Sequence, residues 1–212
     1  MDKKRLSNRV DFMSLQDRIE QHFTQNALTQ QEALLNLSEV IEFASLRLVA
    51  TLLNDNKVLT CGNGGSALNA TQFAVKMLNR FDRERPSLPA FALTTDTATI
   101  TSIANDLLFD DVYAKQIRAL GQSGDILLLY TASGNSANMV KAVSAAHDKD
   151  ISVIALTGQE GGMLAPILNE TDIEIRVPSS IRHRIQETHL LITHCLLDLV
   201  DQQLFGDNSP SR

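Results

Sequence analysis

Tryptophan is absent from the 212 residues, aromatic residues make up only 5%, and the two cysteines are Cys61 and Cys195. Two cysteines with no C-x-x-C or Cys/His spacing exclude a disulfide framework and are not typical of a structural zinc site. A chain of this length still buries roughly 70% of its unfolded surface, so its core needs no cross-links. We therefore expect a reducing compartment, with the cytoplasm as the default location.

Long apolar runs and an excess of positive charge are missing as well. No run reaches the roughly 18 apolar residues of a membrane span, and no apolar signal core follows the charged start of the chain. The formal net charge is −6, which argues against a broad electrostatic surface for nucleic acid. We expect the protein to bind neither a membrane nor nucleic acid directly.

Apolar residues recur at helical spacing over residues 15–54, a stretch without proline. This pattern predicts two helices, 15–36 and 38–54. Farther along the chain, short apolar or β-prone runs alternate with helical patterns. The predicted strands are 57–61, 89–93, 125–130, 151–156 and 173–177, and the predicted helices are near 70–78, 97–105, 112–120, 137–149 and 186–205.

Strand, glycine-rich turn and helix in repetition predict a parallel sheet with helices on both faces. No linker, internal repeat or low-complexity stretch divides the pattern. We therefore expect a single domain over residues 15–205, preceded by a frayed extension over 1–14 and followed by a flexible tail over 206–212.

Two glycine-rich loops follow strands of the predicted sheet: CGNGGS at 61–66 and TASGNS at 131–136. In such sheets, ligands bind beyond the carboxyl ends of strands, at helix N-termini whose free N–H groups attract anions. Neither loop has the P-loop pattern of nucleoside triphosphatases or the G-x-G-x-x-G pattern of dinucleotide sites. Either loop alone is equally well explained as a tight turn with a helix cap. Together, at equivalent places in one sheet, they favour an anion site.

A set of motifs spanning residues 15–205 resembles the sugar isomerase (SIS) family. The motifs are 61–66, 104–106, 133–136, 155–158 with 161–162, and 173–178 followed by 184–189. They are most similar to the branch that holds sedoheptulose 7-phosphate isomerase (phosphoheptose isomerase) and the DnaA initiator-associating protein DiaA. The resemblance implies a flavodoxin-like three-layer α/β sandwich with a five-stranded parallel sheet, N-terminal helices and a long C-terminal helix. It also implies a homotetramer in which neighbouring subunits complete each site.

The resemblance further implies a site for a phosphosugar such as sedoheptulose 7-phosphate. Ala132 stands where the family has a threonine, but a backbone contact would survive this change. By motif match, the phosphosugar-binding positions are Asn63, Gly64, Gly65, Ser66, Asn105, Asp106, Thr131, Ala132, Ser133, Ser136 and Gln186.

The isomerase pattern fails on the helix after the first loop. There the isomerase carries a His and, four residues later, a Glu, both zinc ligands or acid/base groups. Here the two positions are Gln72 and Lys76, and the ammonium of Lys76 would repel zinc. Gln186 and His194 match the two other family positions, but eight residues of a continuous helix separate them by about 12 Å. An intersubunit site or a helix break near Gln186 would bring them together. We expect no metal and no cofactor, with zinc bound only if the protein is an isomerase.

The missing Glu is a group of the kind that contributes about 10²–10⁴-fold to the rate of proton transfer. Our leading hypothesis is therefore a DiaA-like homotetramer with a retained phosphosugar pocket and a degraded isomerase site. It would bind the replication initiator DnaA and promote DnaA assembly at the chromosomal origin. The alternative is a sedoheptulose 7-phosphate isomerase of lipopolysaccharide heptose biosynthesis, with His194 as its catalytic residue. A third hypothesis is a phosphosugar-sensing module.

The sequence also gives predictions for the end of the last helix, for one histidine and for a charged run. Leu204 and Phe205, near the end of the chain, either pack inside the assembly or anchor a partner protein. His189 lies in a long apolar helix, so we predict a hydrogen-bonded core residue. The charged run 80–85 is predicted to be a solvated loop.

Overall fold

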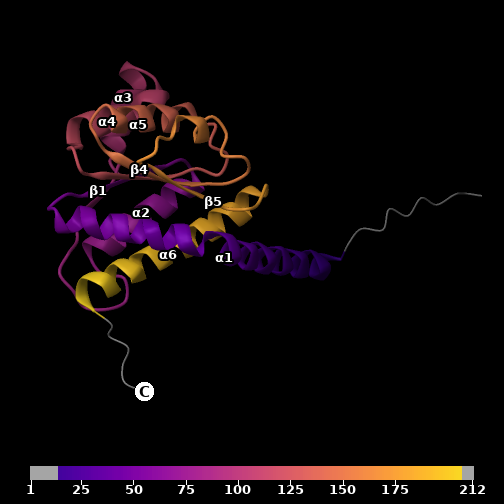
Figure 1. Ribbon diagram of the computed structural model, residues 1–212. Helices are drawn as coiled ribbons and strands as arrows, with labels where there is room; N and C mark the ends of the chain where they lie inside the picture. Colours follow the sequence, from indigo (N-terminus) through magenta and orange to yellow (C-terminus); the bar gives the residue numbers. More distant parts are fainter. Residues whose placement is uncertain (1–13, 207–212) are drawn as a thin grey trace, which may run out of the picture.

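The computed structural model describes residues 14–206 and shows an α/β fold around one sheet (Figure 1). The five strands are all parallel and lie in the order β2-β1-β3-β4-β5. Every residue of β1 and β3 is buried, as expected for strands covered on both faces. The strands are β1 Val58–Gly62, β2 Ala90–Ala92, β3 Ile126–Tyr130, β4 Ser152–Thr157 and β5 Ile173–Arg176.

Helices cover both faces of this sheet and form two separate cores, which confirms the predicted three-layer sandwich. One layer holds α1 Leu15–Leu53, α2 Gly65–Leu78 and α6 Arg182–Phe205. The other layer holds α3 Thr97–Asp106, α4 Val112–Leu120 and α5 Ala137–His147, with the short 3₁₀ turns Phe109–Asp111 and Ala165–Ile167. No helix in the described part of the chain combines the length and apolar character needed to cross a membrane.

The first 39 helical residues form one continuous helix, so the prediction of two helices was wrong. Asn36 and Ser38 do not interrupt α1, because each side chain donates to the carbonyl four residues earlier, at 2.8 and 2.5 Å. Ser14 starts the helix through a reciprocal capping box with Asp17 and therefore does not belong to the predicted N-terminal extension. The predictions for 1–13 and 207–212 lie outside the described residues.

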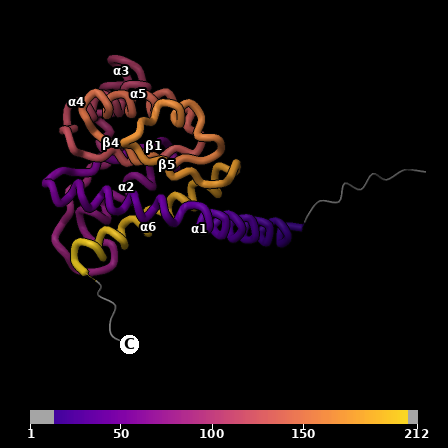
Figure 2. The backbone as a smooth tube through the Cα atoms, in the orientation of Figure 1, coloured from indigo at the N-terminus to yellow at the C-terminus, as the bar shows by residue number. Residues whose placement is uncertain are grey.

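The first half of α1 projects from the body of the molecule (Figure 2). Leu15 and Phe23 on this half are 81% and 75% exposed, and Ile19 between them is exposed as well. Because these residues are four positions apart, they share one side of the helix. The projecting half therefore carries an apolar stripe that the single chain does not cover.

The charged segment 80–85 is only partly the solvated loop that the sequence predicts. Arg80 and Glu84 form an exposed ion pair, in agreement with that prediction. The Arg85 side chain, by contrast, is only 1% exposed and forms an ion pair with Asp201 of α6 at 2.7 Å. The prediction was wrong for Arg85 because its buried partner lies 116 positions away in the sequence.

Candidate functional site

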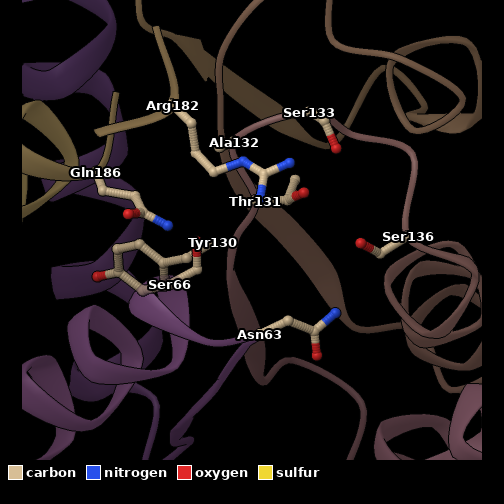
Figure 3. Close-up of a pocket in the computed structure, with 9 residues that line it drawn as sticks. All are labelled: Asn63, Ser66, Tyr130, Thr131, Ala132, Ser133, Ser136, Arg182 and Gln186. Atoms are coloured by element: carbon tan, nitrogen blue, oxygen red, sulfur yellow. The ribbon is translucent and has the colours of Figure 1, made fainter. Parts of the chain in front are cut away.

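A pocket lies beyond the carboxyl ends of β1 and β3, the two strands at which the order of the sheet reverses. Ligands of open parallel sheets bind at this kind of switch point. The cavity has a volume of about 130 Å³. Figure 3 shows the residues that line it: Asn63, Ser66, Tyr130, Thr131, Ala132, Ser133, Ser136, Arg182 and Gln186.

The loop after β1 is fixed on one side of this pocket. The Asn63 and Asn138 amides donate to each other at 2.8 and 2.9 Å. Gly64 has a φ of +55°, a value that favours glycine. At Gly65, a Cβ atom would lie 2.7 Å from the Gln186 side-chain oxygen. Glycine at this position therefore lets the start of α2 approach the pocket-lining turn of α6.

The loop after β3 is fixed on the other side. The Thr131 hydroxyl accepts a bond from the backbone N–H of Gly134 at 3.1 Å. Gly134 has a φ of +67°, and a Cβ there would clash with the Gly161 carbonyl oxygen at 1.9 Å. Its own carbonyl accepts from the N–H of Leu164 at 3.0 Å. The loop is thereby held against residues 161–164, and Ser136 follows as the N-cap residue of α5.

The pocket suits an anion. Both α2 and α5 begin next to it, and neither N-cap residue, Gly64 or Ser136, makes a side-chain capping bond. The N–H of Ser66 donates to the Asn63 carbonyl, but the first two N–H groups of α5 have no partner among the described residues. These N–H groups and the positive dipole ends of both helices are available to a ligand. The described lining contains hydroxyls and amides and no carboxylate, and Arg182 is its one charged side chain.

The same lining lacks a group that could take a proton from carbon near neutral pH. Burial raises the pKa of Tyr130 far above its usual range. The Tyr130 hydroxyl donates to Thr193 at 2.9 Å, because the Thr193 proton is already donated to the His189 carbonyl. A guanidinium donates hydrogen bonds and accepts none, so Arg182 does not take this role. The described residues of one chain thus form a binding pocket without a general base.

The four family positions for zinc do not come together in one chain. Helix α6 is continuous from Arg182, four residues before its predicted start, so no break near Gln186 exists. Gln186 lines the pocket, whereas His194, about 12 Å farther along the axis, packs against the ring of Phe81. Gln72 and Lys76 lie on α2, ~10 and ~16 Å along its axis from Gly65, and neither lines the pocket. These residues of a single chain therefore do not fit a zinc ion.

Most of the sequence-predicted binding residues gather at the pocket. The lining includes Asn63, Ser66, Gln186 and all four predicted residues of the second loop. Gly64 and Gly65 lie between Asn63 and Ser66 in the sequence. Asn105 and Asp106 do not line the pocket: both are exposed at the end of α3, and the Asn105 amide donates to Asp106 at 3.0 Å. Their contact with a phosphosugar stays a prediction.

Two lining residues, Tyr130 and Arg182, were missed by the sequence reasoning. Tyr130 was assigned to a buried strand, whose last side chain reaches the pocket. Arg182 lies four positions before Gln186, so the two share one face of a helix. That spacing could have revealed Arg182, but the predicted helix began at residue 186.

The two candidate partner residues at the end of α6 are half-buried. Leu204 packs against the core beneath α1 and α6. The Arg83 guanidinium lies 5.9 Å from the centre of the Phe205 ring and donates to the Phe205 carbonyl at 3.0 Å. Partner binding by Leu204 and Phe205 stays a prediction.

The ring of His189 lies 6.1 Å from that of the pocket residue Tyr130, and its surroundings confirm the prediction of a hydrogen-bonded core residue. The ring is fully buried, and Nε2 bonds to the Thr157 carbonyl at 2.9 Å. Nδ1 is buried with no partner among the described residues. Burial lowers the pKa of His189 to about 4, and the bond to Thr157 has the opposite but smaller effect.

This histidine should make the protein less stable in acid. Between pH 6.5 and about 4, the unfolded chain binds a proton at His189 that the folded chain does not, so stability falls as the pH falls through this range. The full loss is about 3 kcal/mol. His189→Gln should flatten the pH dependence of the urea unfolding free energy over this window, whereas exposed His183→Gln should leave it unchanged. Equal pH dependence in the wild type and His189→Gln would contradict this assignment.

Comparisons with known proteins agree with this geometry. The family model of the SIS domain matches residues 22–158. The chain is 58% identical over 195 residues to the phosphoheptose isomerase of Methylococcus capsulatus, covering 92% of this chain and all of that protein. It is 54% identical to the DnaA initiator-associating protein DiaA of Shigella flexneri, covering 90% of this chain and 97% of the relative. The solved phosphoheptose isomerase of Francisella tularensis superposes with a TM-score of 0.88 at 47% identity, covering 90% of this chain and all of that one.

Proposed function

The chain belongs to the SIS domain family, and we propose that it binds phosphosugars without isomerising them and acts as an adapter for the initiator protein DnaA. Its branch of the family holds both phosphoheptose isomerases and DiaA. The proposal places the protein in the cytoplasm, with its phosphosugar pocket retained and its partner contacts made by an assembly of several copies.

The observation that carries the proposal is an anion pocket without a base in its own lining, together with Gln72 and Lys76 at the family's acid/base positions. The two loops offer free N–H groups and hydroxyls that suit a phosphate group. The described lining offers no carboxylate, imidazole or amine to move a proton between sugar carbons. The change from the family's His and Glu to Gln72 and Lys76 points in the same direction. We therefore infer binding without turnover.

An assembly of four copies is part of the proposal. The apolar stripe of Leu15, Ile19 and Phe23 on the projecting half of α1 is uncovered in the single chain. Exposed apolar stripes of this kind mark protein interfaces. We propose that this stripe packs against other copies of the chain in a homotetramer.

DnaA is proposed as the partner because of the 54% identity to DiaA over almost the whole of both chains. Gln72 and Lys76, in place of the His and Glu of the isomerases, argue against the enzyme, although relatives named phosphoheptose isomerase are 53–58% identical to this chain. A multivalent assembly suits an adapter, because several weak contacts to DnaA add up through effective concentration.

The test is binding of the purified protein to immobilised DnaA, together with its mass in solution. The proposal predicts a tetramer that DnaA retains, and a Phe23→Asp variant of lower mass that DnaA releases at least 10-fold faster through loss of avidity. Leu120→Asp, which adds the same charge at an exposed apolar site on α4 in the opposite layer, is the matched control. A tetramer that binds phosphosugar but not DnaA would overturn the adapter role and favour the phosphosugar-sensing module.

A second candidate is a sedoheptulose 7-phosphate isomerase, as the names of several relatives suggest. Its specific support is the retention of Gln186 in the pocket and of His194 on the same helix. Because His194 lies about 12 Å from Gln186 along α6, this candidate requires a neighbouring copy to bring a base to the pocket. Zinc would be bound only in that case.

A further inference from the structure

Arg182 is the first residue of α6, and its side chain enters the pocket from the side opposite the loop after β1. Figure 3 shows its guanidinium directed toward the middle of the pocket, over the residues that follow β3. The group is solvent-exposed, and the hydrogen bonds and ion pair that arginines of α6 form among residues 14–206 all belong to Arg184. The five N–H donors of Arg182 are therefore unused by the fold.

Arg184, two residues later, is the opposite case. Its side chain is buried, donates to the His22 carbonyl at 2.6 Å and forms an ion pair with Glu187 at 2.9 Å. Arg184 thus fastens α6 to α1. Arg184 is therefore a structural arginine, whereas the donors of Arg182 point into a cavity whose described lining contains no carboxylate.

The ligand group that fits Arg182 is a dianion. Hydroxyls and amides such as those of Ser133, Ser136 and Gln186 bind neutral sugar hydroxyls and phosphate oxygens alike. A guanidinium in a lining without negative charge favours a negatively charged group specifically, and its planar fork matches two phosphate oxygens. The neighbouring starts of α2 and α5 favour the same charge.

We propose that Arg182 is the specificity-determining residue of the pocket and selects ligands that carry a dianionic phosphate over neutral sugars. The inference rests on the proposed phosphosugar binding and names the residue that makes this binding selective. Arg182 acts on affinity and not on proton transfer. Its contribution should therefore follow the charge of the phosphate, whose second pKa is about 6.

The experiment compares the dissociation constants of sedoheptulose 7-phosphate, inorganic phosphate and unphosphorylated sedoheptulose. Arg182→Gln should weaken the binding of both phosphate-bearing probes about 10–100-fold and leave sedoheptulose unchanged. Arg182→Lys should recover part of the loss, since it restores the charge but not the fork. Lowering the pH from 7.5 to 5 should weaken sedoheptulose 7-phosphate binding more in the wild type than in Arg182→Gln. The control is Arg118→Gln, which removes the same charge from an exposed pair with Asp148.

The outcomes separate this inference from the proposed function. Sedoheptulose 7-phosphate binding that is equal in the wild type and Arg182→Gln would overturn the role of Arg182 and leave phosphosugar binding intact. Arg182-dependent binding of inorganic phosphate, without binding of the phosphosugar, would support Arg182 and overturn the proposed ligand. No binding of any probe by the wild type would overturn both. An unchanged melting temperature of Arg182→Gln shows that the variant is folded.

Discussion

Replacing Gln72 by His and Lys76 by Glu together should raise sedoheptulose 7-phosphate isomerase turnover by about 10²–10⁴-fold over the unmodified protein. The double variant restores the pair that the family's isomerases carry at these positions. A carboxylate can take a proton from one sugar carbon and return it to the next, whereas a charged ammonium cannot. Because neither position lines the pocket of its own chain, the gain requires that the restored pair reach the pocket of a neighbouring copy in the proposed tetramer.

A double-alanine variant and a measurement of substrate affinity serve as controls for this result. Gln72→Ala with Lys76→Ala removes the same side chains without adding a base, so its turnover should stay at the level of the unmodified protein. Sedoheptulose 7-phosphate affinity should be similar in all three proteins, because neither position lines the described pocket. A double variant that binds the substrate, forms the tetramer and shows no gain would contradict the idea that these two changes removed the activity.

Arg85→Ala should destabilise the fold by about 3–5 kcal/mol, the cost of leaving one partner of a buried ion pair uncompensated. Arg85 donates to Asp201 at 2.7 Å and to the carbonyls of Lys76 and Met77 at 2.8 Å. Asp201 is only 3% exposed, and its second oxygen has no partner among the described residues, so the loss of Arg85 leaves a buried carboxylate without its counter-charge. The Lys76 and Met77 carbonyls at the end of α2 lose the guanidinium donor as well, and only Met77 keeps a second bond, from the Leu88 N–H.

Thermal denaturation measures this effect as a fall in melting temperature of roughly 6–20 °C. Replacing both partners, as Arg85→Met with Asp201→Leu, should cost much less than Arg85→Ala, because no buried charge is left alone. Arg80→Ala breaks only the exposed pair with Glu84 and should cost below about 1 kcal/mol. Equal melting temperatures for Arg85→Ala and Arg80→Ala would show that the buried pair contributes little.

The sheet and its loops could be predicted from the sequence because their signals are local. The run at 125–130 is apolar throughout, as a strand covered on both faces must be, and it lies where β3 is found. The glycine loops at 61–66 and 131–136 end such strands and meet at the pocket. Gly134 is required by its close approach to Gly161.

Other features could not be predicted from a local pattern. They depend on contacts between residues distant in the sequence, or on which of two possible side-chain bonds forms. Asn36 and Ser38 can either cap a new helix or bond back to the preceding turn, and the structure shows the second. The burial of Arg85 depends on Asp201, a partner distant in the sequence. The place of Arg182 in the pocket depends on where α6 starts, four residues before the predicted boundary.

The most direct test of the account is an NMR assay of sedoheptulose 7-phosphate conversion by the unmodified protein, with the substrate saturating and with or without added zinc. Binding would be measured on the same sample by ligand-induced thermal stabilisation. We expect stabilisation by the phosphosugar and no conversion above that of a His194→Ala control. Conversion well above this control would contradict the account and establish the protein as an isomerase with an unusual site.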